Sequence, residues 1–144
     1  MQTQTSRRSS LFLLELMIAI LFFILASGIC IRLFVKSHTL EQASRNLDAS
    51  VREAVSVAEI LRSQDDPFSV LETVYPLGIS ENGDFTIYYD KNWELCTESD
   101  GAYRLRLSTA MDASFLTGTI NVYQAETLLY NLSVEKYIPK EEGL

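Results

Sequence analysis

Few residues in this sequence have the types and spacing that enzymes use. Its 144 residues include a single histidine, His38, and two cysteines, Cys30 and Cys96. One histidine leaves little room for a histidine-rich metal site, and it leaves a serine or cysteine triad without an alternative base. Two cysteines cannot form the disulfide framework of a small secreted protein. We therefore expect no enzymatic activity and no cofactor.

Two acidic segments could bind a cation. Asp84, Asp90 and Glu94 bracket a turn, and residues 98–101 form an acidic loop. Carboxylate oxygens are ligands that Ca²⁺ prefers, but neither segment has the ligand spacing of an EF-hand loop. Carboxylates of this kind are more often solvated, so we expect no metal site.

Glu15 is the residue whose position calls for an explanation. It lies in an apolar stretch, residues 11–35, that is interrupted only by Glu15 and Arg32. A carboxylate in a membrane-spanning helix costs roughly 2.5 to 3.5 kcal/mol at the helix centre, judged from aspartate, and less near the interface. Such a residue is a candidate functional site when a partner for it can be named.

A positive partner for Glu15 would arise if the chain were cut between Ser10 and Leu11. The new α-amino group would lie four residues before Glu15. In an assembly of staggered parallel helices, it could neutralise the Glu15 carboxylate of a neighbouring chain. Two unit charges about 4 Å apart attract by roughly 4 kcal/mol at an effective dielectric constant of 20, which is large against the cost of burying each charge. This hypothesis makes Glu15 an assembly residue.

The segment RRSSLFLLELMIAILFFILA resembles the cleavage and N-methylation segment of type IV prepilins and of the pseudopilins of type II secretion systems. In that family a prepilin peptidase removes a short basic leader after a small residue, usually glycine, and the new N-terminal residue is methylated. The resemblance implies cleavage after Ser10, methylation of Leu11 and a role for Glu15 in packing between subunits. Ser10 replaces the usual glycine, and Leu11-Phe12 replaces the usual phenylalanine and small polar residue.

The element that must position these residues is a membrane-spanning helix. Its centre, Leu16–Ile31, is uncharged, and 25 helical residues span roughly 37 Å, enough to cross a hydrocarbon core of about 30 Å. Arg7 and Arg8 precede the apolar stretch, whereas residues 36–144 carry 9 of the 12 basic and 18 of the 19 acidic residues, a formal charge of −9. The positive-inside rule therefore predicts a cytoplasmic N-terminus and an extracytoplasmic C-terminal part.

Other interpretations of such an N-terminus remain open. A secretory signal peptide could be cut near Ala26-Ser27-Gly28, although Glu15 is unfavourable in its apolar core. A plain signal anchor needs no special residue and gives no reason for Glu15. It is the main alternative, and it would make the protein a single-pass, extracytoplasmic interaction or sensor protein without filament assembly.

The helix is predicted to continue beyond the membrane. Neither glycine nor proline occurs between Ile29 and Asp66, so we expect a helix from about residue 12 to residue 63. Apolar residues in its second half follow steps of three and four and form one stripe: Leu40, Ala43, Leu47, Val51, Ala54, Ala58 and Leu61. We expect this stripe to pack on the C-terminal body, since its alanines would make a weak coiled coil.

The C-terminal body is predicted to be mostly β. A short helix is expected from Asp66-Pro67 to about Val74. After Asn82-Gly83 the apolar period changes to two, which indicates strands. Five segments are candidate strands. In four of them the residues on the apolar face are, in chain order, Phe85, Ile87 and Tyr89; Tyr103, Leu105 and Leu107; Ile120 and Val122; and Leu128, Tyr130, Leu132 and Val134. The fifth segment is residues 93–96, which follow the first. The predicted fold class is α+β: a long N-terminal helix packed on a small antiparallel sheet of four to five strands, as the pilin resemblance also implies.

Four parts follow from these patterns: a basic leader (1–10), a transmembrane and assembly half of the helix (11–35), an amphipathic half (36–63) and an extracytoplasmic β domain (64–144). The resemblance implies a minor pilin or pseudopilin of a type IV pilus, competence or type II secretion-like filament. Its expected partners are a prepilin peptidase, other pilin-like subunits, the inner-membrane assembly machinery and membrane lipid. We expect it in the cell membrane as a single-pass protein, and in filaments at the cell surface. The acidic body argues against direct nucleic-acid binding.

Overall fold

The computed structural model describes the backbone of residues 3–139 and the side chains of residues 8–139. The chain divides into two units, residues 1–43 and residues 44–144. The first two residues of the predicted leader and the side chain of Arg7 lie outside the described part of the chain.

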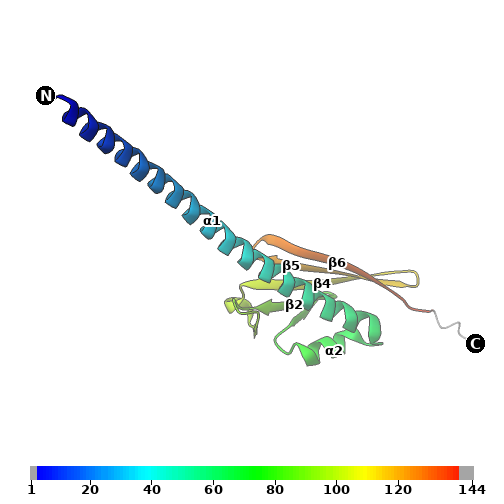
Figure 1. Ribbon diagram of the computed structural model, residues 1–144. Helices are drawn as coiled ribbons and strands as arrows, with labels where there is room; N and C mark the ends of the chain where they lie inside the picture. The colour runs from blue at the N-terminus through cyan, green and yellow to red at the C-terminus, as the bar shows by residue number, and fades with distance from the viewer. Residues whose placement is uncertain (1–2, 140–144) are drawn as a thin grey trace, which may run out of the picture. The chain divides into compact units, whose positions relative to one another are not determined.

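Helix α1 extends from Thr3 to Ser63 (Figure 1). Its continuation past Ile29 confirms the prediction made from the absence of glycine and proline. Its start differs from the prediction, because the helix begins well before residue 12 and includes the Ser10–Leu11 bond. A helix that has formed propagates at little cost through residues other than glycine and proline, so the short polar leader joins it.

The second unit combines the end of α1 with a short helix and one antiparallel sheet. Helix α2 is Pro67–Val74, and Asp66 caps it by accepting a hydrogen bond from the Ser69 amide at 3.4 Å. Proline at the first helical position and a side-chain cap are what the sequence predicted.

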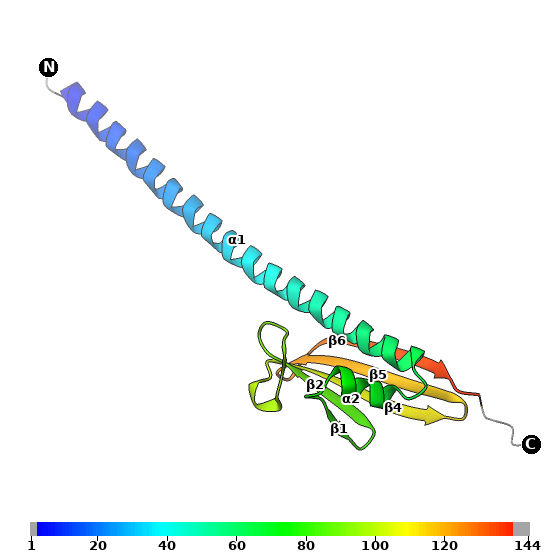
Figure 2. The same cartoon turned by 90° about the horizontal axis from the view of Figure 1, so that it is seen from below.

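The sheet has six strands, in the order β1-β2-β4-β5-β6, with β3 pairing on β2 (Figure 2). The strands are β1 (Ile79–Glu81), β2 (Asp84–Tyr89), β3 (Leu95–Cys96), β4 (Tyr103–Asp112), β5 (Phe115–Gln124) and β6 (Thr127–Tyr137). A 3₁₀ turn, η1 (Glu98–Asp100), links β3 to β4. The α+β class is confirmed, but the predicted count of four to five strands is wrong.

The strand that the sequence prediction missed is β1. Its three residues are all exposed, so no apolar alternation marks it. It forms because Asn82 and Gly83 both take positive φ angles, 53° and 85°, and turn the chain back so that Ile79 pairs with Thr86. Asn-Gly is the residue pair that two-residue hairpin turns favour.

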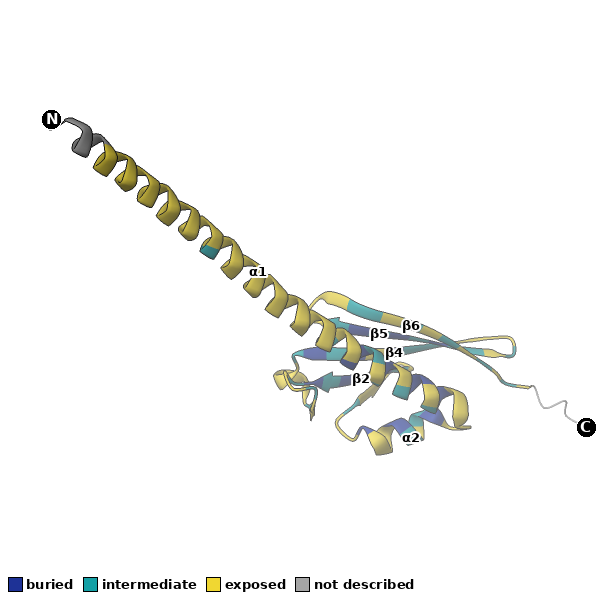
Figure 3. Ribbon diagram, in the orientation of Figure 1, coloured by how far each residue is buried: buried dark blue, intermediate teal, exposed yellow. Residues whose placement is uncertain are grey.

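The core lies between α1, α2 and one face of the sheet. Alternate residues of β2 are fully buried, as expected: Phe85, Ile87 and Tyr89. The same holds for Leu105 and Leu107 on β4 and for Ile120 and Val122 on β5. All members of this cluster belong to residues 54–122, and Figure 3 shows the buried positions at this end of the chain.

The helix stripe that packs on the sheet is shorter than predicted. Ala54, Ala58 and Leu61 are buried, together with Val57, which the predicted stripe did not include. Leu40, Ala43 and Leu47 are exposed, so their assignment to the packed stripe is wrong. Helical spacing alone predicted which residues share a face, but only the length of the sheet determines how far up the helix that face is covered.

A β-bulge changes which residues of β6 face the core. The register between β5 and β6 shifts between Val122 and Tyr123, so that Tyr123 pairs with Leu128 but Val122 pairs with Tyr130. Leu129 is the extra residue, and it packs against the core while Leu128 is 51% exposed. The prediction that placed Leu128 on the apolar face is therefore wrong, because a bulge reverses the alternation beyond it.

Candidate functional site

The three residues singled out by the sequence lie on the first unit's part of α1. Ser10, Leu11 and Glu15 are all helical and exposed. Residues four apart in a helix share a face one turn apart, so Leu11 and Glu15 are neighbours on the helix surface. Ser10 and Leu11 are successive residues and point in different directions. No hydrogen bond or ion pair of Glu15 is found within residues 8–139.

The apolar segment around Glu15 is uncovered by the chain itself. Leu11 is 64% exposed and Phe34, near the other end, is 79% exposed. Between Leu11 and Val35 every residue except the half-buried Ser27 is exposed, and Figure 3 shows this part of α1 almost entirely in the colour of exposed residues. Helix α1 is long and apolar enough to cross a membrane, and none of its most apolar window is buried. A signal sequence near the N-terminus would have the same length and composition.

Charges mark the two ends of the apolar segment. Glu15 and Arg32 are 17 residues apart, which corresponds to about 26 Å along a helix. A hydrocarbon core is about 30 Å thick, so both charges would lie close to its boundaries when the helix spans it. At such a depth a carboxylate costs less than at the centre.

The acidic turn between β2 and β3 uses its carboxylate to hold its own backbone. One oxygen of Asp90, Oδ1, accepts hydrogen bonds from the amides of Asn92 at 2.7 Å and Glu94 at 3.0 Å. Trp93, in the same turn, has a φ of 64°. Side-chain bonds of this kind stabilise tight turns. The role of Asp90 is therefore accounted for without a ligand.

Two further acidic side chains near the turn, Asp84 and Glu98, have protein partners. Asp84 accepts a hydrogen bond from Nε of Arg106 at 2.9 Å, and this bond holds the pKa of the Asp84 carboxyl below its usual range. Glu98 accepts a hydrogen bond from the Tyr88 hydroxyl at 3.1 Å. Among the described residues, no group of three or more histidine, cysteine or acidic side chains could hold a metal ion.

Both cysteines are free thiols. Cys30 is exposed on the apolar part of α1, and Cys96 is half-buried on β3. Burial raises the pKa of the Cys96 thiol, and the nearby Asp90 and Asp100 raise it further. A raised pKa lowers the fraction of reactive thiolate. His38 is exposed on α1.

A polar link between α1 and the sheet was not predicted from the sequence. The buried Tyr89 hydroxyl donates a hydrogen bond to Oε2 of Glu53 at 3.0 Å. Burial raises the pKa of Tyr89, and the Glu53 carboxylate raises it further, so this hydroxyl stays protonated and remains a donor. Glu53 directly precedes the buried Ala54 in the sequence. A carboxylate at the border of an apolar helix face was the one feature of the sequence that could have indicated this hydrogen bond.

Comparisons with family models, with curated proteins and with solved structures found no match for this chain.

Proposed function

We propose that this chain is a structural subunit of a pilin-like filament, a minor pilin or pseudopilin that is stored in the membrane and assembled through its N-terminal helix. The observation that carries the proposal is a carboxylate, Glu15, on an apolar helical segment that the chain itself does not cover. An uncovered apolar helix needs lipid or other helices around it, and a carboxylate within it needs a cation.

The geometry of the helix supports this role for Glu15. Cleavage after Ser10 would create an α-amino group on Leu11, which lies one helical turn from Glu15 on the same face. In a bundle of parallel helices displaced along their axes, the amino group of one subunit meets the carboxylate of the next. This pairing selects one axial displacement between subunits, because any other leaves a charge without a partner in an apolar surrounding.

The proposed maturation follows the resemblance to prepilins. A prepilin peptidase removes residues 1–10, Leu11 is methylated, and the inner-membrane assembly machinery adds the subunit to others of its kind. The leader is cytoplasmic and residues 36–144 are extracytoplasmic, as the charges on the two sides of the apolar segment favour. The fold of the second unit, a helix packed on an antiparallel sheet, is of the kind that the pilin resemblance implies. No catalytic role is proposed.

The test is the N-terminus of the protein extracted from membranes of a host with active processing machinery. Mass spectrometry should find a chain that begins at methylated Leu11. An intact leader ending at Ser10 would overturn the proposal and favour a permanently anchored extracytoplasmic interaction or sensor protein. Replacement of Ser10 by a large residue, Ser10→Trp, provides the control, since it should block cleavage while leaving membrane insertion unchanged.

A further inference from the structure

The two edges of the sheet differ in how well they are protected. One edge consists of β1 and β3, which have three and two residues. The other edge is β6, which has 11 residues and pairs only with β5 among the strands described. Its central stretch, Leu128–Val134, contains neither a charged residue nor a proline. Natural sheets blunt exposed edges with short strands, charges or prolines, so a long uncharged edge indicates a place where another strand binds.

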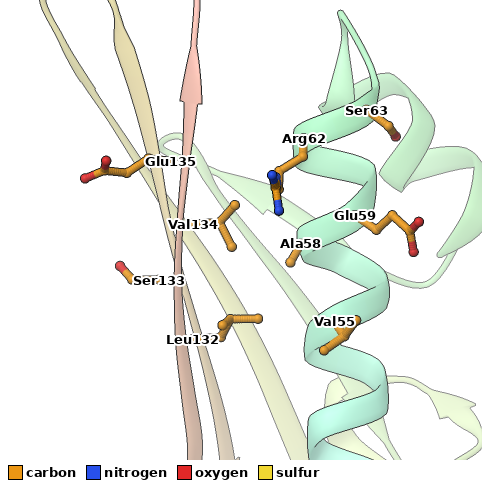
Figure 4. Close-up of a pocket in the computed structure, with 9 residues that line it drawn as sticks. All are labelled: Val55, Ala58, Glu59, Arg62, Ser63, Leu132, Ser133, Val134 and Glu135. Atoms are coloured by element: carbon orange, nitrogen blue, oxygen red, sulfur yellow. The ribbon is translucent and has the colours of Figure 1, made fainter.

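A groove adjoins this edge. It lies between the last two turns of α1 and β6, and its volume is about 830 Å³ (Figure 4). Val55 and Ala58 of the helix face the strand, and Leu132 and Val134 of the strand face the helix. These four aliphatic residues form the part of the α1–β6 groove where helix and strand face each other, and its other lining residues are polar or charged: Glu59, Arg62, Ser63, Ser133 and Glu135.

The groove exists because Leu61 of α1 packs over β5, the neighbour of the edge strand β6. Leu61 is fully buried and lies directly over Gly118 of β5, where even a single added carbon would collide with it. β6 lies one strand further out and is only half covered, so Leu132 and Val134 keep part of their surface exposed.

Arg62 gives the groove a charge. Glu59 and Glu135 also line the groove, but their carboxylates point outward, whereas the Arg62 side chain points into the space between helix and strand (Figure 4). Within the described part of the chain, no ion pair or hydrogen bond engages the Arg62 guanidinium. A guanidinium is well suited to bind a carboxylate with two parallel hydrogen bonds.

We propose that the free edge of β6 and the α1–β6 groove bind an extended segment of a partner protein as a seventh strand. Only an extended chain can pair with the free main-chain groups along a strand edge. Because side chains alternate along a strand, every second side chain of the segment would enter the groove. The segment therefore carries aliphatic side chains at alternate positions and one carboxylate opposite Arg62.

This site is independent of the processing and assembly proposed for Ser10, Leu11 and Glu15, because all of its residues belong to the second unit. Seven residues of strand extend about 23 Å, which is the length of the uncharged stretch Leu128–Val134. Failure of this proposal would leave the filament proposal unaffected, and the reverse also holds.

The test uses the full-length protein in lipid nanodiscs and a synthetic peptide, VTVTETV, in which valines and one glutamate occupy every second position. Fluorescence anisotropy measures the affinity, and hydrogen exchange measures protection of the β6 amides. The peptide should bind and slow exchange at Leu128–Val134. The variant peptide VTVTKTV should bind about tenfold more weakly, because its lysine would face Arg62.

Variants of the protein separate the groove from the rest of the surface. Val55→Lys should weaken binding about tenfold, since it fills the groove with a charged side chain. Leu47→Lys is the matched control, because Leu47 is 45% exposed and Val55 is 47% exposed on the same helix, but Leu47 does not line the groove. Arg62→Glu should reverse the preference between the two peptides.

Three outcomes would overturn the proposal. The first is failure of both peptides to bind or to protect β6, and the second is equal weakening by Val55→Lys and Leu47→Lys. The third is protection, without peptide, of those β6 amides that do not donate hydrogen bonds to β5. Protection that disappears on dilution would assign the edge to a second copy of this chain, and protection that persists would assign it to a segment of the chain itself.

Discussion

Glu15 shows how a single residue can define a functional hypothesis. On a soluble helix an exposed glutamate needs no explanation, but this one lies beside Leu14 and Leu16, which are 56% and 46% exposed. The surroundings that suit these leucines are unfavourable for a carboxylate. In the proposed filament, neighbouring helices would cover the apolar surface and bring a cation to this carboxylate.

Glu15→Ala should therefore leave membrane insertion intact or improve it, because it removes a cost of up to roughly 3 kcal/mol. It should lower incorporation into filaments at least tenfold, measured as the ratio of protein in the sheared filament fraction to protein in the membrane. Met17→Ala is the control, since Met17 is 70% exposed on the same segment and carries no charge. Normal incorporation of the Glu15 variant would show that the carboxylate has no role in assembly.

The Asp84–Arg106 pair predicts a dependence of stability on pH. The hydrogen bond from Arg106 lowers the pKa of Asp84 in the folded protein. A lowered pKa stabilises the fold above the carboxyl's ordinary pKa of about 3.9, and the stabilisation is lost as the pH falls through the lowered value. Asp84→Asn should therefore reduce the melting temperature slightly at pH 7, and the difference from the unmodified protein should vanish toward pH 2.

Circular dichroism melts between pH 2 and pH 7 measure this effect. Asp112→Asn provides a control with the same change in charge, because Asp112 is an exposed residue near the β4–β5 turn. The expectation fails if the two variants lose the same stability at pH 7, or if the effect of Asp84→Asn persists at pH 2.

At the scale of elements, the contact between α1 and β5 determines how closely the helix approaches the sheet. A Cβ atom on Gly118 would collide with Leu61, a fully buried residue that has little room to move. Glycine is required here because of the close approach and not because of its backbone conformation, since its φ is not positive.

Gly118→Ala should lower the free energy of unfolding by about 1–3 kcal/mol, because overpacking displaces the helix or strains Leu61. Leu61→Ala alone should cost about 2–5 kcal/mol through the cavity that it leaves. The double variant should be more stable than the sum of the two losses predicts, because the added methyl group fills part of that cavity. Urea denaturation measures the free energy of unfolding of all three variants. Strictly additive losses in the double variant would contradict a direct contact between Leu61 and Gly118.

The whole molecule divides into a part that folds on its own core and a part that requires an apolar surrounding. The buried cluster lies entirely within residues 54–122. The apolar segment, by contrast, contributes large exposed side chains from Leu11 to Val35. The stability of the two units therefore depends on different surroundings.

A fragment that begins at Ser44 should accordingly be soluble and folded without detergent, with the same fluorescence as the full chain. Trp93, the single tryptophan, reports on this directly because it stacks on Tyr103 with ring centres 4.2 Å apart. The full chain should remain with membranes in alkaline carbonate. If the fragment aggregates, or if its Trp93 fluorescence differs from that of the full chain, the second unit depends on the first for its folding.

Much of the architecture followed from local chemistry in the sequence. The absence of glycine and proline after Ile29 predicted the long helix, and Asp66-Pro67 predicted the start of α2. Alternation at Phe85, Ile87 and Tyr89 predicted the buried face of β2. These features depend on neighbouring residues of one segment, and such preferences are written directly into the order of amino acids.

The candidate residues Ser10, Leu11 and Glu15 also came from the sequence, since their significance rests on type and spacing along one helix. Other features required contacts between distant segments. The bulge that turns Leu128 outward arises only when β5 and β6 pair, and the exposure of Leu47 depends on where the sheet ends beneath the helix.

The sequence by itself determined the apolar segment, its charge and the strand-forming alternation, because each is a property of consecutive residues. Only the tertiary structure decided that α1 crosses the sheet over Gly118 and that β6, within residues 3–139, has a neighbouring strand on one side alone. The physical reason is that covering a surface is a competition among distant elements. The outcome depends on their sizes and their separations, which no single segment encodes.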